Sequence, residues 1–204
     1  MDLDLTKLTD DRKLRLFAVA CVREVSDLLF DERSKNAVDV AERFADGLAS
    51  EEELDNANSA AWTTANSVAM DAAWSVAWAA YYTTSVAYNA ASNAAYYSAR
   101  FLRDRTESAS ACYAEYDAAK EKQQLFLNDI TDKPNIIISP ESLAWNNQTL
   151  SKLATQIYNN KQFEDMSILA DALQDANATT QFIQHCYKPV HIKGCWLIDI
   201  LMEK

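Results

Sequence analysis

The chain has 204 residues, a formal net charge of −11 and a pI of about 4.6. Duplex nucleic acid is therefore not an expected partner, because neutralising phosphates requires basic patches. Only two glycines occur, which argues against a glycine-rich phosphate loop and an α/β nucleotide fold. The four cysteines form no dense framework and the first residues are charged, so we expect no signal peptide, reduced thiols and a cytoplasmic protein.

The first part of the sequence predicts two amphipathic helices. Thr9 is the candidate N-cap of a helix over residues 10–30, whose apolar positions recur at helical spacing. Ser34 is the candidate N-cap of a second helix over residues 35–46. Gly47 follows directly and is expected to end that helix in a left-handed conformation.

Residues 56–99 form the most unusual stretch of the chain. Ser50 and Glu53 make an S-x-x-E capping box that starts a long helical region. Alanine dominates residues 56–99, glycine and proline are absent, and Asp71 carries the only charge. A helix that is uncharged nearly all round is usually interior. Small residues spaced seven apart between Ala69 and Ala94 predict a seam that another helix covers, from this chain or from a second copy, so a homo-oligomer is expected.

Two other interpretations of this stretch are disfavoured. A membrane span would need a higher density of Leu, Ile, Val and Phe, and no membrane association is expected. An ice-binding helix would need a regular threonine face, whereas the threonines here come in isolated pairs. Residues 51–131 are either one rod or a kinked helix, and a break near residues 105–110 suits a compact domain better.

The remainder of the chain predicts further helices. An ordinary charged helix is expected up to residue 131. The Ile-rich segment between Pro134 and Pro140 is predicted to be extended. Apolar periodicity then predicts short helices over residues 148–160, 163–176, 179–187 and 195–203. We therefore predict an all-α fold and a single domain, with a long-helix bundle over residues 1–131, an extended connector over 132–147 and a C-terminal helical cap over 148–204.

Several segments together resemble an uncharacterised bacterial family of alanine-rich, all-helical proteins. They are DRKLRLFAVACVREV near the start, DERSKNAVDVAERFADG after it, ILADALQDAN, and HCYKPVHIKGCW near the end. The resemblance covers most of the chain outside the alanine-rich middle. It implies an all-helical fold and adds no catalytic residue.

The segment HCYKPVHIKGCW, residues 185–196, is the densest polar cluster. One interpretation is a zinc site, because Cys186, His191 and Cys195 supply suitable ligand types within a short loop. A structural zinc site needs four ligands, and the position of His185 next to Cys186 in the sequence is a poor one for the fourth. The default remains a tight structural loop between two helices, so no metal site is assigned from the sequence.

The same segment also allows an anion site. His185, Lys188, His191 and Lys193 make a locally positive loop in an acidic protein. Gly194 stands near the start of the last predicted helix, where backbone N–H groups can point at a phosphate or carboxylate. The zinc, anion and structural interpretations stay open at this point.

The leading functional hypothesis is the non-catalytic binding of a small anionic aromatic ligand, with a nucleotide as the first candidate. Sequestration of a nucleotide immune signal, as phage anti-defence proteins perform it, is one such function. The alternative is a protein–protein interaction module that docks through the alanine- and aromatic-rich helix. No nucleophile or paired-acid motif occurs, so we expect no enzyme, no catalytic residue and no cofactor. The candidate ligand-binding residues are Trp74, Trp78, Tyr81, Tyr82, Tyr96, Tyr97, Arg100, Arg103, His185, Lys188, His191 and Lys193.

Overall fold

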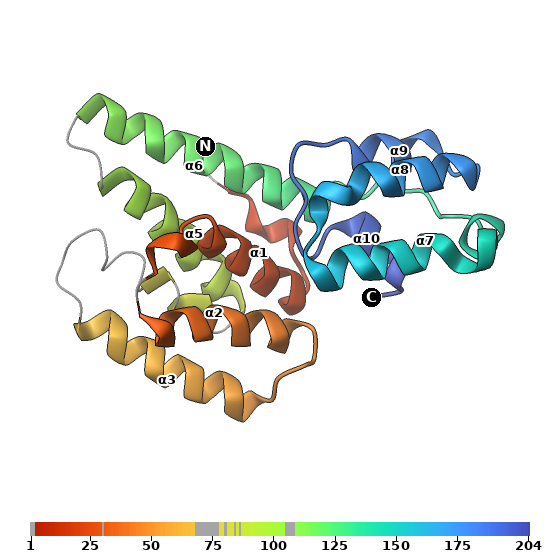
Figure 1. The fold of residues 1–204 in the computed structure, drawn as a ribbon. Helices are drawn as coiled ribbons and strands as arrows, with labels where there is room; N and C mark the ends of the chain where they lie inside the picture. Colours follow the sequence, from red (N-terminus) through yellow and green to blue (C-terminus); the bar gives the residue numbers. More distant parts are fainter. Residues whose placement is uncertain are drawn as a thin grey trace. The chain divides into compact units, whose positions relative to one another are not determined.

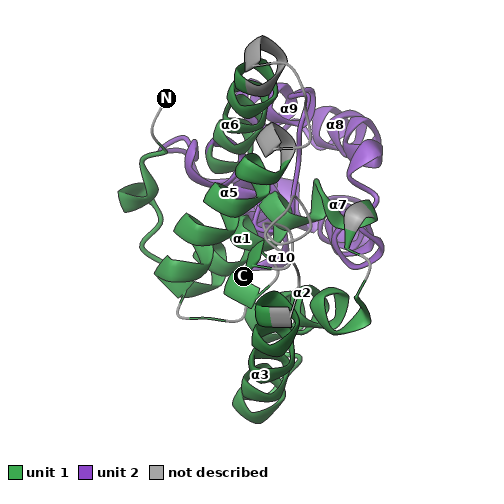
Figure 2. Cartoon of the chain, turned by 90° about the vertical axis from the view of Figure 1, so that its left-hand side faces the viewer, with its two compact units in different colours: residues 1–127 green, residues 128–204 purple. Residues whose placement is uncertain are grey.

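The computed structural model describes residues 3–29, 31–67, 78–79, 81–83, 85, 87–104 and 109–204. These residues form helices and no strand, which confirms the predicted all-α fold (Figure 1). Two compact units are present, residues 1–127 and 128–204, where the sequence predicted a single domain with subdivisions (Figure 2). The α-helices of the described ranges are α1 Asp11–Arg23, α2 Glu32–Ala45, α3 Glu51–Ser67, α5 Ala87–Asp104, α6 Ala109–Thr131, α7 Pro140–Asn160, α8 Met166–Asp175, α9 Thr180–Cys186 and α10 Trp196–Met202.

The first two helices begin at aspartate caps. The Asp10 carboxylate accepts a hydrogen bond from the Arg12 amide at 2.8 Å, and Asp31 accepts one from the Arg33 amide at 2.8 Å. Thr9 and Ser34, the caps predicted from the sequence, are not the N-caps of these helices. Aspartate both satisfies an orphan amide and places negative charge at the positive end of the helix dipole, so α2 starts three residues earlier than predicted.

The next two predicted helix signals are present. Gly47 follows α2 with φ of 72°, the left-handed conformation that glycine adopts without strain. The amide of Glu53 donates to the Ser50 hydroxyl at 3.1 Å, and the Ser50 amide donates to the Glu53 carboxylate at 2.9 Å. This reciprocal pair is the predicted capping box, and α3 begins beside it.

The alanine seam is buried over its described part. Ala90 and Ala94 of α5 have no exposed surface, and α1 of the same chain packs along α5. Ala69, Ala73 and Ala80 lie outside the described residues. Because α1 covers the described part of the seam, this part requires no second copy, and homo-oligomerisation stays a prediction. Within the described ranges, no helix combines the length and apolar character needed to cross a membrane.

The region over residues 51–131 is not one continuous rod. Ser85 lies in a bend, and α5 begins two residues later. The buried guanidinium of Arg15 donates to the carbonyl of Thr83 at 2.7 Å and to that of Ser85 at 2.9 Å. Arg15 therefore satisfies carbonyl groups that a continuous helix would have paired internally. Residues 105–108, where a break was expected, lie outside the described part.

Residues 128–204 fold around an apolar core of their own. In this unit α7 packs against α8 and α10, and α8 packs against α9 (Figure 1). The extended connector ends at Ser139 rather than at residue 147, because the Ser139 hydroxyl accepts from the Ser142 amide and Pro140 opens α7. The helix is interrupted over residues 145–148, where three residues have positive φ, and it resumes close to the start predicted from the sequence.

Candidate metal centre

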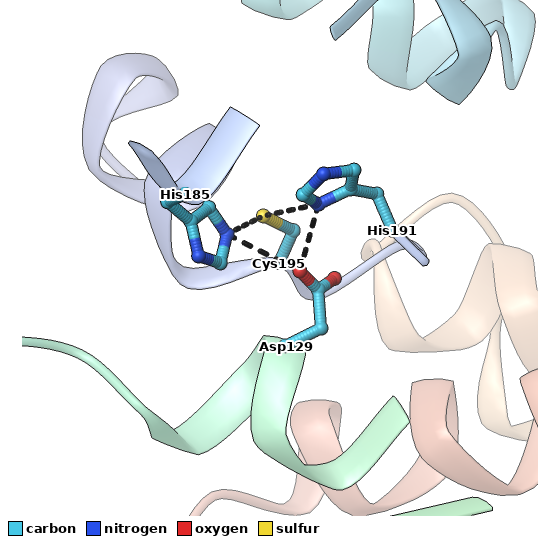
Figure 3. Close-up of side chains that lie close together, drawn as sticks. All are labelled: Asp129, His185, His191 and Cys195. Atoms are coloured by element: carbon cyan, nitrogen blue, oxygen red, sulfur yellow. Dashed lines mark hydrogen bonds and ion pairs between the residues drawn. The ribbon is translucent and has the colours of Figure 1, made fainter. Parts of the chain in front are cut away.

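Four side chains within residues 128–204 converge on one point (Figure 3). Asp129 comes from the last turn of α6, His185 from the end of α9, and His191 and Cys195 from the loop that leads to α10. One donor atom from each of the four lies within 4.8 Å of all the others. Carboxylate, imidazole and thiol groups are the ligand types of transition-metal sites in proteins.

The distances between the donor atoms are short. Oδ1 of Asp129 lies 2.8 Å from Nδ1 of His191 and 3.2 Å from Nε2 of His185. The sulfur of Cys195 lies 3.1 Å from Nε2 of His185 and 4.0 Å from Nδ1 of His191. The side chains of Asp129, His185 and His191 are 1%, 2% and 4% exposed, and Cys195 is fully buried. The cluster is therefore almost completely shielded from solvent.

Helical spacing turns Asp129 inward. Phe126 and Ile130 of α6 are 2% exposed, and they lie three residues before and one residue after Asp129. Residues three apart share a helix face, so the carboxylate is carried on a buried face. Its second oxygen, Oδ2, accepts a hydrogen bond from the Ile192 amide at 3.0 Å. That bond leaves Oδ1 to face the histidines.

Packing orients His185. Phe182, three residues earlier on α9, is fully buried, so the same helix face points into the core of the unit. The ring centroid of His185 lies 4.3 Å from that of Trp196 and 5.1 Å from that of His191. Nδ1 of His185 is buried and has no hydrogen-bond partner among the described residues. Ring contacts therefore hold this imidazole, with Nε2 directed at Asp129 and Cys195.

The loop before α10 brings in the other two ligands. The Cys195 amide donates to the Ile192 carbonyl at 3.0 Å, which closes a tight turn. Gly194 in this turn has φ of 93°, a conformation that only glycine adopts readily. Nε2 of His191 lies 3.3 Å from the Cys186 carbonyl, so the turn fixes the ring with Nδ1 toward the cluster. Gly194 thus allows the sharp turn that brings Cys195 to the cluster.

Burial and neighbouring charge shift the ionisation of the cluster. Burial raises the pKa of the Cys195 thiol well above its ordinary value, and the negative charge of Asp129 raises it further. Burial lowers the pKa of His185 despite the nearby carboxylate. Burial alone would raise the pKa of Asp129, but hydrogen bonds from His185, His191 and the Ile192 amide together bring it below its ordinary value. Without a bound cation the site combines a carboxylate with a neutral thiol.

Only part of this group was predictable from the sequence. The zinc ligands considered from the sequence were Cys186, His191 and Cys195, whereas the structure has His185 rather than Cys186 in the cluster. The Cys186 sulfur instead lies 3.5 Å from the Phe182 carbonyl, to which its thiol donates. Asp129 was missed altogether, because it is 62 residues from His191 and no spacing motif connects them.

The aromatic residues predicted to stack a ligand form a cluster in residues 1–127. The rings of Tyr82 and Tyr97 are stacked with centroids 5.5 Å apart, and Trp78 lies 6.3 Å from Tyr97. Tyr81 and Tyr96 contact this group edge-on. Trp74 and Asp71 lie outside the described residues, as does the side chain of Arg103. Arg100 is half-buried in the same unit.

The predicted cations of the C-terminal loop have partners within residues 128–204. Nζ of Lys188 lies 3.5 Å from an Asp132 oxygen, and Nζ of Lys193 lies 4.5 Å from the ring centroid of Tyr158. His185 and His191 belong to the metal-type cluster. The expected ligand-binding residues are thus divided between the two units. Binding of an anionic aromatic ligand stays a prediction, and so does docking of a protein partner.

No protein-family model, no curated protein and no solved structure matches this chain. The geometry of the cluster is therefore the basis for the functional assignment.

Proposed function

We propose that residues 128–204 bind one divalent transition-metal ion between Asp129, His185, His191 and Cys195. The observation that supports this proposal is the convergence of four metal-binding donor atoms within 4.8 Å of one another in a buried place. The four donors come from α6, α9 and the loop before α10. A bound ion would join these segments at a single point.

A bound cation explains why this cluster is inside the protein. Burying a carboxylate beside two imidazoles and a thiol has a large desolvation cost. A protein with apolar side chains of similar volume at such positions is often at least as stable as one with the buried charges. The positive charge of a metal ion compensates the carboxylate and the thiolate directly. Coordination also replaces the hydrogen bonds to water that each buried donor has lost.

The proposed role of the ion is structural. Four protein donors fill the four positions of a closed site, whereas catalytic zinc sites keep one position open for water or substrate. Asp129 and His191 are 62 residues apart, so the ion would fasten the C-terminal segment to the end of α6. We accordingly propose a non-catalytic binding protein whose C-terminal unit is closed by a metal ion.

The test is metal analysis of the full-length chain, purified without a metal-affinity tag. We expect about one equivalent of metal per chain and a lower melting temperature after chelation. Asp129→Asn should lose the metal. The matched control is Asp132→Asn, because Asp132 is an exposed neighbour that pairs with Lys188 and should leave the metal content unchanged.

The proposal fails if the wild-type chain holds no metal after dialysis against zinc, cobalt or nickel salts and its melting temperature is unaffected by chelator. It also fails if Asp129→Asn and Asp132→Asn retain metal equally.

A further inference from the structure

We infer that the ion is zinc, bound by the Cys195 thiolate, Nε2 of His185, Nδ1 of His191 and Oδ1 of Asp129. This inference rests on the proposed metal site and adds the identity of the ion and of each donor atom.

The donor set excludes the hard cations. Calcium takes six to eight oxygen ligands and magnesium prefers octahedral oxygen coordination, whereas this cluster offers a single carboxylate. A thiolate with two imidazoles suits a borderline-soft ion. Zinc accepts sulfur, nitrogen and oxygen donors together in one four-coordinate site.

The separations between donors fit zinc bond lengths. Zinc–nitrogen and zinc–oxygen bonds of about 2.1 Å in a tetrahedron place their donors about 3.4 Å apart, and a sulfur donor lies about 3.6 Å from a nitrogen. The nitrogen–oxygen separations here are 2.8 and 3.2 Å. The sulfur–nitrogen separations are 3.1 and 4.0 Å, on either side of the expected value. Small side-chain movements would therefore admit the ion.

The contacts of His191 suit metal binding through Nδ1. Nε2 faces the Cys186 carbonyl, an acceptor, at 3.3 Å, and Nδ1 faces the Asp129 carboxylate, a second acceptor, at 2.8 Å. A neutral imidazole has one N–H and donates to one of these acceptors, whereas an imidazolium donates to both. With zinc on Nδ1, the proton stays on Nε2 and donates to the carbonyl, as metal-ligating histidines commonly do. The ring is thus arranged for a metal at Nδ1.

The backbone of the loop positions the carboxylate ligand. The Ile192 amide donates a hydrogen bond to Oδ2 of Asp129, which leaves Oδ1 as the carboxylate oxygen that binds the metal. The carboxylate is therefore held in place by a main-chain N–H group, whose position does not depend on the ion.

The experiment is titration of the metal-free full-length chain with cobalt(II), followed by zinc(II). We expect intense visible absorption of a four-coordinate cobalt ion and a near-ultraviolet thiolate-to-cobalt charge-transfer band, both removed by one equivalent of zinc. Cys195→Ala should abolish the charge-transfer band. The matched control Cys186→Ala removes a neighbouring buried thiol that donates to the Phe182 carbonyl, and it should keep the band.

The outcomes separate the two proposals. If no metal binds at all, the proposed metal site and this inference both fail. If a metal binds but the wild-type cobalt complex lacks the charge-transfer band, or zinc does not displace cobalt, only the inference fails. Because that spectrum is recorded on the wild-type chain, the decision does not depend on whether Cys195→Ala folds.

Discussion

The two units of this chain stabilise buried polar and small side chains in different ways. In residues 1–127, fully buried alanines such as Ala90 and Ala94 let α1 and α5 approach closely. The buried charges there have protein partners: Glu42 pairs with Arg23 at 2.7 Å, and Arg15 donates to backbone carbonyls. These contacts use only groups that the chain itself provides.

In residues 128–204, by contrast, one buried carboxylate, that of Asp129, is surrounded by side chains of metal-binding types. Asp129 faces two histidines and a cysteine beside a core built from larger side chains such as Phe182 and Trp196. With the proposed ion bound, the two units would close their helical cores differently, one by the fit of small residues and one by a shared ligand that ties distant segments together. This difference predicts that metal removal affects one unit and spares the other.

The largest expected effect of a substitution comes from equivalent core deletions in the two units. Phe17 and Phe182 are both fully buried, and replacing either by Ala should cost about 3–5 kcal/mol of stability. Phe182 lies one helical turn before His185, so Phe182→Ala should also weaken metal binding, whereas Phe17→Ala should leave it unchanged. Denaturant unfolding with metal titration measures both quantities. Equal metal affinity in the two variants would contradict the coupling of core and site in residues 128–204.

Overpacking the alanine seam should have a smaller effect. Ala94→Leu adds volume to a position with no exposed surface where α1 packs along α5, and it should cost about 1–3 kcal/mol. Ala87→Leu, at 3% exposure, should act in the same direction. Metal content should remain at the wild-type value. Unchanged melting temperatures for both variants would mean that the seam is not tightly packed.

The smallest expected effect concerns the cap of α2. Hydrogen bonds from the Arg33 side chain lower the pKa of Asp31 from 3.8 to about 2. The Asp31 carboxylate therefore contributes fully to the free energy of unfolding above about pH 4, and this contribution is lost as the pH falls toward 2. The carboxylate is partly exposed, so Asp31→Ala should cost only about 1 kcal/mol at neutral pH.

The control for this cap is Asp31→Asn, which keeps an N-cap acceptor and should lose less stability than Asp31→Ala. The stability difference between wild type and Asp31→Ala should shrink as the pH falls from about 4 to 2. A difference that stays constant over this range would contradict a charged cap.

The fold was largely predictable because it depends on local signals. The capping box at Ser50 and Glu53, Gly47 after α2, and the apolar spacing that defines α8–α10 all act within a few residues. Predictions failed where a stronger local competitor was present, as when Asp31 rather than Ser34 capped α2. The Ser85 carbonyl at the bend accepts a hydrogen bond from Arg15, 70 residues away, and no local sequence pattern indicates that contact.

The candidate site was only partly predictable for the same reason. His191 and Cys195 share a short loop, but Asp129 comes from a helix that is distant in the sequence. The available signal for Asp129 was an acidic residue between Phe126 and Ile130, on an otherwise apolar helix face. His185 was set aside because it adjoins Cys186. In the last turn of α9, however, adjacent side chains point about 100° apart, so His185 faces the cluster and Cys186 does not.

The most direct test of the account is hydrogen exchange of the full-length chain, with and without chelator. If a metal ion closes residues 128–204, chelation should accelerate amide exchange in α9, α10 and the last turn of α6, while α1 and α5 stay as protected as in the metal-loaded chain. Exchange that is unchanged everywhere, or accelerated equally in α1 and α5, would contradict a metal ion that closes residues 128–204.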